Sequence, residues 1–139
     1  MKHDFYTTYH EQEDHHWWFV ARRHIIKKLI DLSRSRRKNK TINLLEVGAG
    51  TGGNLALLST YGHLHAMEMD KEACQLANNR NICDVKQGTL PDQLPFDIPF
   101  DIICMLDVLE HIEDDLATLK RLKKALTPTG ELFITVPAY

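Results

Sequence analysis

The chain has few of the residues that would place it among disulfide-linked, zinc-binding or membrane proteins. Its three cysteines, Cys74, Cys83 and Cys104, are odd in number and lack C-x-x-C spacing, which argues against a disulfide framework or a zinc site. No apolar run approaches the roughly 20 residues of a membrane span, and the N-terminus shows no signal-peptide pattern. We therefore expect a cytoplasmic protein whose 139 residues, 43% of them hydrophobic, form one soluble domain.

Acidic residues are scarce before residue 40, and basic residues are scarce after it. Residues 1–40 carry ten Lys and Arg against five Asp and Glu, whereas residues 41–139 carry seven against fourteen. The basic run lacks the interleaved aromatic residues of a single-strand binding surface, so nucleic-acid binding is disfavoured. At a helix end we expect such cations to be solvated. The run consists of Arg34, Arg36, Arg37, Lys38 and Lys40.

Glycine is infrequent, yet three of the seven glycines alternate at positions 48, 50 and 52. They follow an apolar run that ends in Glu46 and Val47. This pattern predicts a strand that turns sharply beside a nucleotide-like cofactor, because glycine permits positive φ and a close approach of the backbone to a ligand.

Two cofactor classes are compatible with this turn. Gly48, Gly50 and Gly53 also satisfy G-x-G-x-x-G, with Glu68 about 20 residues further on, so an NAD-dependent oxidoreductase is an alternative. A pyrophosphate favours bare N–H groups and a helix N-terminus. S-adenosylmethionine carries a sulfonium and an α-ammonium, and both favour a nearby carboxylate such as Glu46.

Strands and helices are expected to alternate along the core. The expected strands are 42–47, 64–69, 84–87, 100–106 and 131–136, and the expected helices are 52–59, a helix capped by Asp70, and one carrying Leu116, Leu119, Leu122 and Leu126 that Pro128 and Gly130 stop. Helices between strands force parallel pairing, so we expect an α/β, Rossmann-like, doubly wound sheet of order 3-2-1-4-5. Its ligand crevice is expected at the carboxyl ends of the first and fourth strands.

Five segments in register resemble the class I S-adenosylmethionine-dependent methyltransferases, and small-molecule enzymes of the ubiquinone-biosynthesis type in particular. The segments are E-V-G-A-G-T-G-G at 46–53, A-M-E-M-D at 66–70, Q-G-T-L-P-D-Q-L-P-F at 87–96, F-D-I-I-C-M-L-D-V-L-E-H-I at 100–112 and L-T-P-T-G-E-L-F-I-T-V-P at 126–137. The resemblance implies that S-adenosylmethionine is the cofactor and that a small molecule is the methyl acceptor.

The resemblance also assigns the cofactor contacts. Gly48, Ala49, Gly50 and Gly52 are expected to wrap the methionine part, with Glu46 acting through its charge. Glu68 is the candidate for the two ribose hydroxyls, since a carboxylate accepts from both at once, and Met69 offers an apolar surface for adenine. Thr89, beside Leu90, occupies a place where relatives often have an Asp that binds the adenine amino group, so this chain departs from the pattern there.

The end of the fourth strand is expected to form the cleft floor. Asp107 is a candidate cofactor contact, and His111 is the candidate general base, because its unperturbed pKa is about 6.5; a structural role in the loop is the alternative for His111. His15 and His16 are not expected to bind metal, since adjacent side chains diverge on a helix.

The region before the core, residues 1–40, is expected to form a basic and aromatic helical segment, and residues 41–139 the methyltransferase core. A helix from about Glu13 to Ser35 would pack through Trp18, Ala21, Ile25, Leu29 and Leu32. Related enzymes often carry an aromatic-plus-Arg element here, as in His15 to Phe19 with Arg22 and Arg23, which lines the acceptor pocket. One of the two adjacent tryptophans, Trp17 and Trp18, is expected to be partly exposed.

The chain ends at Tyr139, just after the expected fifth strand. Members of the family usually continue with a helix and an antiparallel strand pair, so we expect a fragment of a longer enzyme. Strand five would then have an open edge, through which the chain could form a homo-oligomer. A fragment that binds the cofactor without catalysing transfer is therefore a second alternative.

Overall fold

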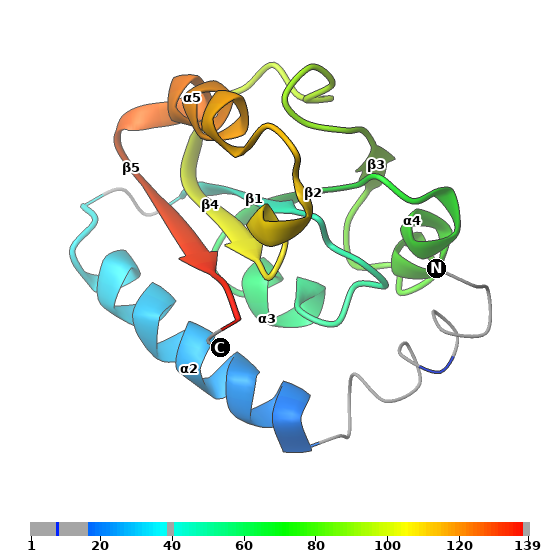
Figure 1. The fold of residues 1–139 in the computed structure, drawn as a ribbon. Helices are drawn as coiled ribbons and strands as arrows, with labels where there is room; N and C mark the ends of the chain where they lie inside the picture. Colours follow the sequence, from blue (N-terminus) through cyan, green and yellow to red (C-terminus); the bar gives the residue numbers. More distant parts are fainter. Residues whose placement is uncertain (1–7, 9–16, 39–40, 138–139) are drawn as a thin grey trace.

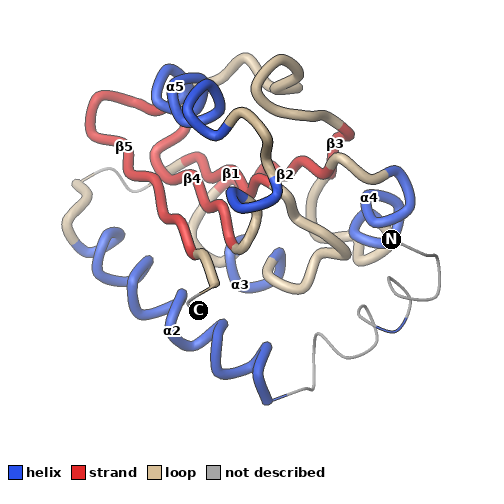
Figure 2. The backbone as a smooth tube through the Cα atoms, viewed as in Figure 1, coloured by secondary structure: helices blue, strands red, loops and turns tan. Residues whose placement is uncertain are grey.

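The computed structural model describes residues 8, 17–38 and 41–137. Within these residues, five parallel strands form one sheet of order β3-β2-β1-β4-β5, with helices on both of its faces (Figure 1 and Figure 2). The predicted Rossmann-like, doubly wound architecture is confirmed. No helix in these ranges is both long enough and apolar enough to cross a membrane.

The first four strands agree closely with the expected ones. The elements in chain order are α2 Trp17–Ser35, β1 Asn43–Val47, α3 Leu55–Ser59, β2 His63–Glu68, α4 Lys71–Asn78, β3 Val85–Gln87, β4 Phe100–Leu106, the 3-10 helix η1 Leu109–His111, α5 Asp115–Ala125 and β5 Leu126–Thr135. Bounds of β1 to β4 lie within one residue of the prediction. Asp70 caps α4 as expected, because its Oδ1 accepts a hydrogen bond from Ala73 N at 2.9 Å.

Apolar side chains fill both faces of the sheet. On one face, Ile26 and Ile30 of α2 pack in a cluster with Leu58 of α3 and Ile102 of β4. On the other face, the buried cluster includes Phe100, Ile103 and Met105 of β4 and Leu122 and Ala125 of α5. Figure 1 shows α2 and α3 below the sheet and α5 above it. Because β4 is covered on both sides, its sequence from Ile102 to Leu106 is a continuous apolar run.

The predicted packing face of α2 is wrong. Its members are exposed: Trp18 by 50%, Ile25 by 62%, Leu29 by 45% and Leu32 by 57%. The buried residues are Ile26, Ile30 and Ser33, which lie about 100° further round the helix. Arg22 and Ser33 also form hydrogen bonds with β5. A pattern of hydrophobic residues in the sequence does not predict such polar contacts. The expected helix start at Glu13 lies outside the described residues.

The junction of α5 and β5 also differs from the prediction. The helix ends at Ala125, before Pro128 and Gly130, and β5 begins at once with Leu126 opposite Phe100. Regular pairing resumes with Glu131 opposite Ile102. Residues 127–130 therefore form an irregularity within the strand, where proline and glycine are tolerated.

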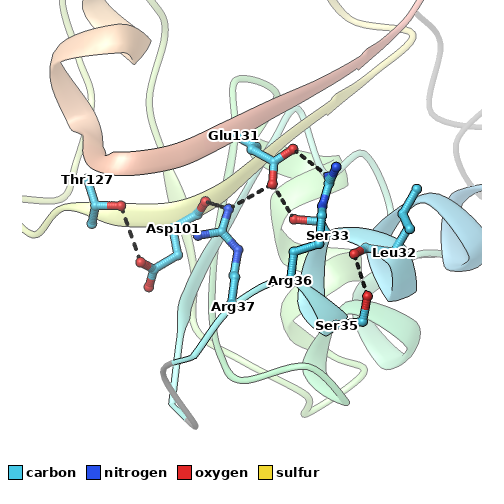
Figure 3. A network of polar contacts seen from close by, with 8 residues as sticks. All are labelled: Leu32, Ser33, Ser35, Arg36, Arg37, Asp101, Thr127 and Glu131. Carbon is cyan, nitrogen blue, oxygen red and sulfur yellow. Dashed lines mark hydrogen bonds and ion pairs between the residues drawn. The ribbon is translucent and has the colours of Figure 1, made fainter.

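A polar network fastens the C-terminal end of α2 to β4 and β5 (Figure 3). Glu131 accepts hydrogen bonds from Ser33 at 2.6 Å, Arg37 at 3.1 Å and Arg36 at 3.3 Å. Arg37 also donates to the Asp101 carbonyl at 3.0 Å. The expectation that the basic run is solvated is wrong for Arg37, whose side chain is only 8% exposed. Lys40 lies outside the described residues.

Candidate functional site

A cleft of about 1160 Å³ opens at the carboxyl ends of β1, β2 and β4, and the N-terminal part of α2 forms one wall of it. This is the point where the strand order reverses, and open α/β sheets bind ligands there. Ten of the predicted site residues line the cleft: Glu46, Gly48, Ala49, Gly50, Glu68, Met69, Thr89, Leu90, Asp107 and His111. Gly52 is not among the lining residues.

The glycine turn leaves space for a ligand at one position. Gly48 and Gly50 both have positive φ, of +70° and +57°. A Cβ added at Gly48 would lie 2.9 Å from Cγ1 of Val108 and closer still to Cγ2, whereas a Cβ at Gly50 would meet nothing within 4 Å. An added Cβ at Gly52 would lie 3.2 Å from Cα of Ala77 in α4 and 2.9 Å from Cδ of Arg80, which follows that helix. Gly50 therefore borders the open cleft, while the other two glycines are required by packing within the protein.

The backbone N–H groups of the turn are already engaged within the protein. Gly48 N and Ala49 N both donate to the Met67 carbonyl at 3.0 Å. Gly50 N donates to Glu68 Oε1 at 2.9 Å, and Gly52 N donates to the Ala49 carbonyl at 3.0 Å. A pyrophosphate would need such N–H groups to be available.

Glu68 joins the glycine turn to the end of β2. In addition to the bond from Gly50, its Oε2 accepts from Asp70 N at 2.7 Å. Each carboxylate oxygen can accept a further hydrogen bond. The predicted contact with ribose hydroxyls is therefore compatible with this geometry and stays a prediction.

Glu46 lies at the floor of the cleft and is only 2% exposed. Its Oε2 accepts a hydrogen bond from Asn54 Nδ2 at 3.3 Å. Burial, with smaller contributions from the negative charges of Glu46 and Asp84, raises the pKa of the Cys83 thiol to about 11. Burial followed by the charge of Glu46 also raises the pKa of Cys104. The carboxylate that Glu46 contributes to the cleft thus has little exposure to water.

The end of β4 contributes Asp107 in a left-handed conformation, with φ of +56°. Its carboxylate forms an ion pair with Arg22 of α2 and accepts from the Thr135 hydroxyl at 3.1 Å. The structure thus adds contacts within the protein to a side chain that we predicted to contact the cofactor. Arg22 belongs to the element that we expected to line the acceptor pocket. Its ion pair with Asp107 could not be predicted from a local sequence pattern, because 84 residues lie between the two.

His111 lies on η1 at the rim of the cleft. Its side chain is 77% exposed, and its Nε2 lies 3.6 Å from Glu110 Oε1. Met69, 63% exposed, and Leu90, 8% exposed, line the β2 and β3 side together with Thr89. We expected one of the two adjacent tryptophans to be partly exposed. Both are exposed, Trp17 by 72% and Trp18 by 50%.

Sequence reasoning missed Thr51. It lies between Gly50 and Gly52, is 1% exposed and lines the cleft. Its Oγ1 has no hydrogen-bond partner within the described part of the chain. A buried hydroxyl of this kind beside a cleft is a candidate ligand contact. No group of three or more metal-ligating side chains occurs among the described residues. His15 and His16, which we did not expect to bind metal, lie outside these residues.

Comparison with known proteins identifies the family of this chain. The profile described as methyltransferase domain matches residues 15–139. An uncharacterized methyltransferase from Staphylococcus carnosus is 33% identical over 94 residues, which are 66% of this chain and 45% of that protein.

Solved structures share the fold. An amino pentose methyltransferase from Micromonospora echinaspora, solved with S-adenosylmethionine bound, superposes with a TM-score of 0.77 at 19% identity and covers 100% of this chain and 58% of its own. A sugar N-methyltransferase from Streptoalloteichus gives 0.68 at 20% identity, covering 79% and 47%. The chain thus spans about half the length of these relatives. Because the family profile covers nearly all of the chain, the protein belongs to the methyltransferase domain family.

Proposed function

We propose that the cleft binds S-adenosylmethionine and that the protein transfers its methyl group to a small-molecule acceptor. The observation that carries the proposal is the combination of an open space at Gly50 with a buried carboxylate at Glu46. A cationic ligand is favoured beside such a carboxylate. The alternative, NAD, is disfavoured because the turn's N–H groups at positions 48, 49, 50 and 52 are already bonded within the protein.

We assign the methionine part of the cofactor to the glycine turn and to Glu46, and we add the Thr51 hydroxyl as a donor to the ligand's carboxylate. Glu68 is assigned to the ribose hydroxyls. Met69, Thr89 and Leu90 are assigned to adenine. These assignments follow from the resemblance and from the lining of the cleft, except the contact at Gly52, which follows from the resemblance alone.

The bound cofactor supplies an electrophilic methyl group and a good leaving group, the neutral sulfide. The protein's contribution is mainly to position the acceptor, and well-oriented reactants can gain up to about 7–11 kcal/mol in this way. A base is needed only where the acceptor carries a proton that must leave. His111 is our candidate, since it lies at the rim of the cleft and can exchange protons with water.

A small-molecule acceptor is supported by the named relatives, which are an amino pentose methyltransferase and a sugar N-methyltransferase. We do not propose nucleic acid as a partner, because Arg36 and Arg37 of the basic run are bonded to Glu131. The cytoplasmic location and the division into residues 1–40 and 41–139 stay predictions.

Isothermal titration of the protein with S-adenosylmethionine, S-adenosylhomocysteine and NAD tests the proposal. We expect both adenosyl ligands to bind with 1:1 stoichiometry and NAD to give no heat above dilution. Binding of NAD alone would refute the assignment.

We also propose that the outer edge of β5 pairs with a second copy of the chain. β5 is the edge strand of the described sheet, and the segment Leu132–Val136 carries no charge. Ile134 is 37% exposed and Val136 is 55% exposed. Such an edge favours strand pairing between chains, and a charge at its surface opposes it. Light scattering over a concentration series is expected to show association that Ile134→Lys abolishes; a monomer at all concentrations would contradict the proposal.

A further inference from the structure

A second polar contact holds the N-terminal half of α2 at the cleft. The Arg22 side chain, 19% exposed, forms an ion pair with Asp107 and donates to the Thr135 hydroxyl at 2.6 Å. That hydroxyl donates in turn to Asp107 Oδ1 at 3.1 Å. The three residues come from three separate elements: α2, the loop after β4, and the end of β5. We call them the Arg22 clamp.

The clamp also accounts for the unusual backbone of Asp107. A residue other than glycine is disfavoured at a φ of +56° and needs surrounding contacts to hold it there. Asp107 N donates to the Thr135 carbonyl at 2.9 Å and lies 3.1 Å from its hydroxyl. The next residue, Val108, packs against Gly48 of the glycine turn. A change at Asp107 would therefore be transmitted to the turn.

We infer that Arg22 is a positioning residue of the cofactor cleft, an inference that rests on the function proposed above. Its planar guanidinium can contact a carboxylate and a hydroxyl at the same time, which an ammonium group does less well. Phe19 and Arg23, on either side of it in α2, line the same cleft. The clamp fixes this wall and, through Asp107 and Val108, the position of the glycine turn.

The chain offers a matched control on the same helix. Lys27 forms an exposed ion pair with Asp31 four residues away, at 2.7 Å, and does not line the cleft. Lys27→Met removes one positive charge from α2, as Arg22→Met does, without altering the clamp. The C-terminal end of α2 provides an internal reference in both variants, because Glu131 holds Ser33 there.

Hydrogen–deuterium exchange of the ligand-free protein tests the clamp without reference to any cofactor. In Arg22→Met we expect the amides of the N-terminal half of α2 to exchange about tenfold faster or more, as expected for local opening. Amides near Ile30 and Ser33 should keep their protection, and Lys27→Met should match the parent throughout. Unchanged exchange in Arg22→Met would overturn the inference.

Titration with S-adenosylhomocysteine then separates positioning from simple destabilisation. We expect Arg22→Met to bind the ligand about tenfold more weakly than the parent protein, and Lys27→Met to bind it like the parent. The affinity of Arg22→Lys should lie between those of the parent and Arg22→Met. In a double-mutant cycle, Arg22→Met with Asp107→Asn should bind no more weakly than the weaker of the two single variants, because both remove one interaction.

Three outcomes bear on the inference differently. Additive losses in the cycle, or parental affinity in Arg22→Met, would overturn the positioning role even if the melting temperature fell. If the parent itself failed to bind the ligand, the proposed function would fail, and the positioning role would fail with it. The exchange experiment would still show whether Arg22 holds the helix.

Discussion

Gly50→Ala probes the cleft with a single methyl group. The substitution retains the N–H that donates to Glu68, so the turn keeps this hydrogen bond. The added Cβ meets no protein atom within 4 Å. The stability cost is therefore restricted to the backbone, because an L-residue at a φ of +57° is disfavoured by roughly 1–2 kcal/mol.

Binding is expected to suffer separately. If the cofactor occupies the space beside Gly50, the methyl group forces the ligand or the turn to shift, and overpacking of this kind costs about 1–3 kcal/mol. That range corresponds to a loss of about 5- to 150-fold in affinity. Gly50→Val, with a branched side chain, is expected to abolish binding. Titration calorimetry measures the affinity, and urea unfolding measures the free energy of folding.

Gly48→Ala is the matched comparison, since its φ is also positive but its Cβ would overlap Val108. We expect it to lower the free energy of unfolding by about 1–3 kcal/mol more than Gly50→Ala does. Val108→Ala in the same chain should recover part of that loss by removing the overlap. If Gly50→Ala binds S-adenosylhomocysteine as tightly as the parent, the ligand does not lie against the turn and the assignment of the cleft is wrong.

Three further predictions concern other parts of the site and the fold. Glu68→Ala should weaken S-adenosylhomocysteine binding by about 1–3 kcal/mol in calorimetry, through loss of charge-assisted hydrogen bonds; equal affinity would remove the ribose assignment. Cys83, whose pKa is raised to about 11 mainly by burial, should react slowly with iodoacetamide at pH 8, with a rate that climbs until the pH passes about 11; fast labelling at pH 8 would show that the thiol is not shielded. Glu131→Gln should lower the free energy of unfolding in urea by about 1–2 kcal/mol, because Arg37 is left with a weaker partner at a partly exposed site; an unchanged midpoint would mean that this network adds little stability.

The sequence predicted β4 well because Ile102 to Leu106 form a short, continuous apolar run of the kind that buried parallel strands have. It failed on α2 because that helix carries two apolar stripes about 100° apart. The stripe of Trp18, Ile25, Leu29 and Leu32 is the longer one, yet Ile26 and Ile30 pack on the sheet. Arg22 and Ser33 form hydrogen bonds with β5 when the helix packs through Ile26 and Ile30, and the partners are 113 and 98 residues apart in the sequence. No local pattern encodes them.

The site was predictable where its chemistry is local. Glu46 and Glu68 lie at the carboxyl ends of β1 and β2, the glycine turn follows β1 directly, and the fold brings all three to one cleft. The distinct roles of the glycines were not predictable, since they depend on what each Cβ would meet. Val108 faces Gly48 from another loop, and the space beside Gly50 is defined by elements that are distant in the chain.

The burial of Glu46 connects the stability of the domain with its ligand. Burying a carboxylate that is 2% exposed costs desolvation free energy, which hydrogen bonds such as the one from Asn54 at 3.3 Å offset. Burial is the main cause of the raised pKa of the Cys83 and Cys104 thiols, and the nearby carboxylate of Glu46 raises the pKa of both further; Cys104 is the residue beside Glu46 in β4. A cation bound in the cleft would gain from the same charge, and S-adenosylmethionine carries two, whereas the pyrophosphate of NAD would be repelled. The proposed role of Glu46 would thus select between two cofactors that the glycine pattern alone does not separate.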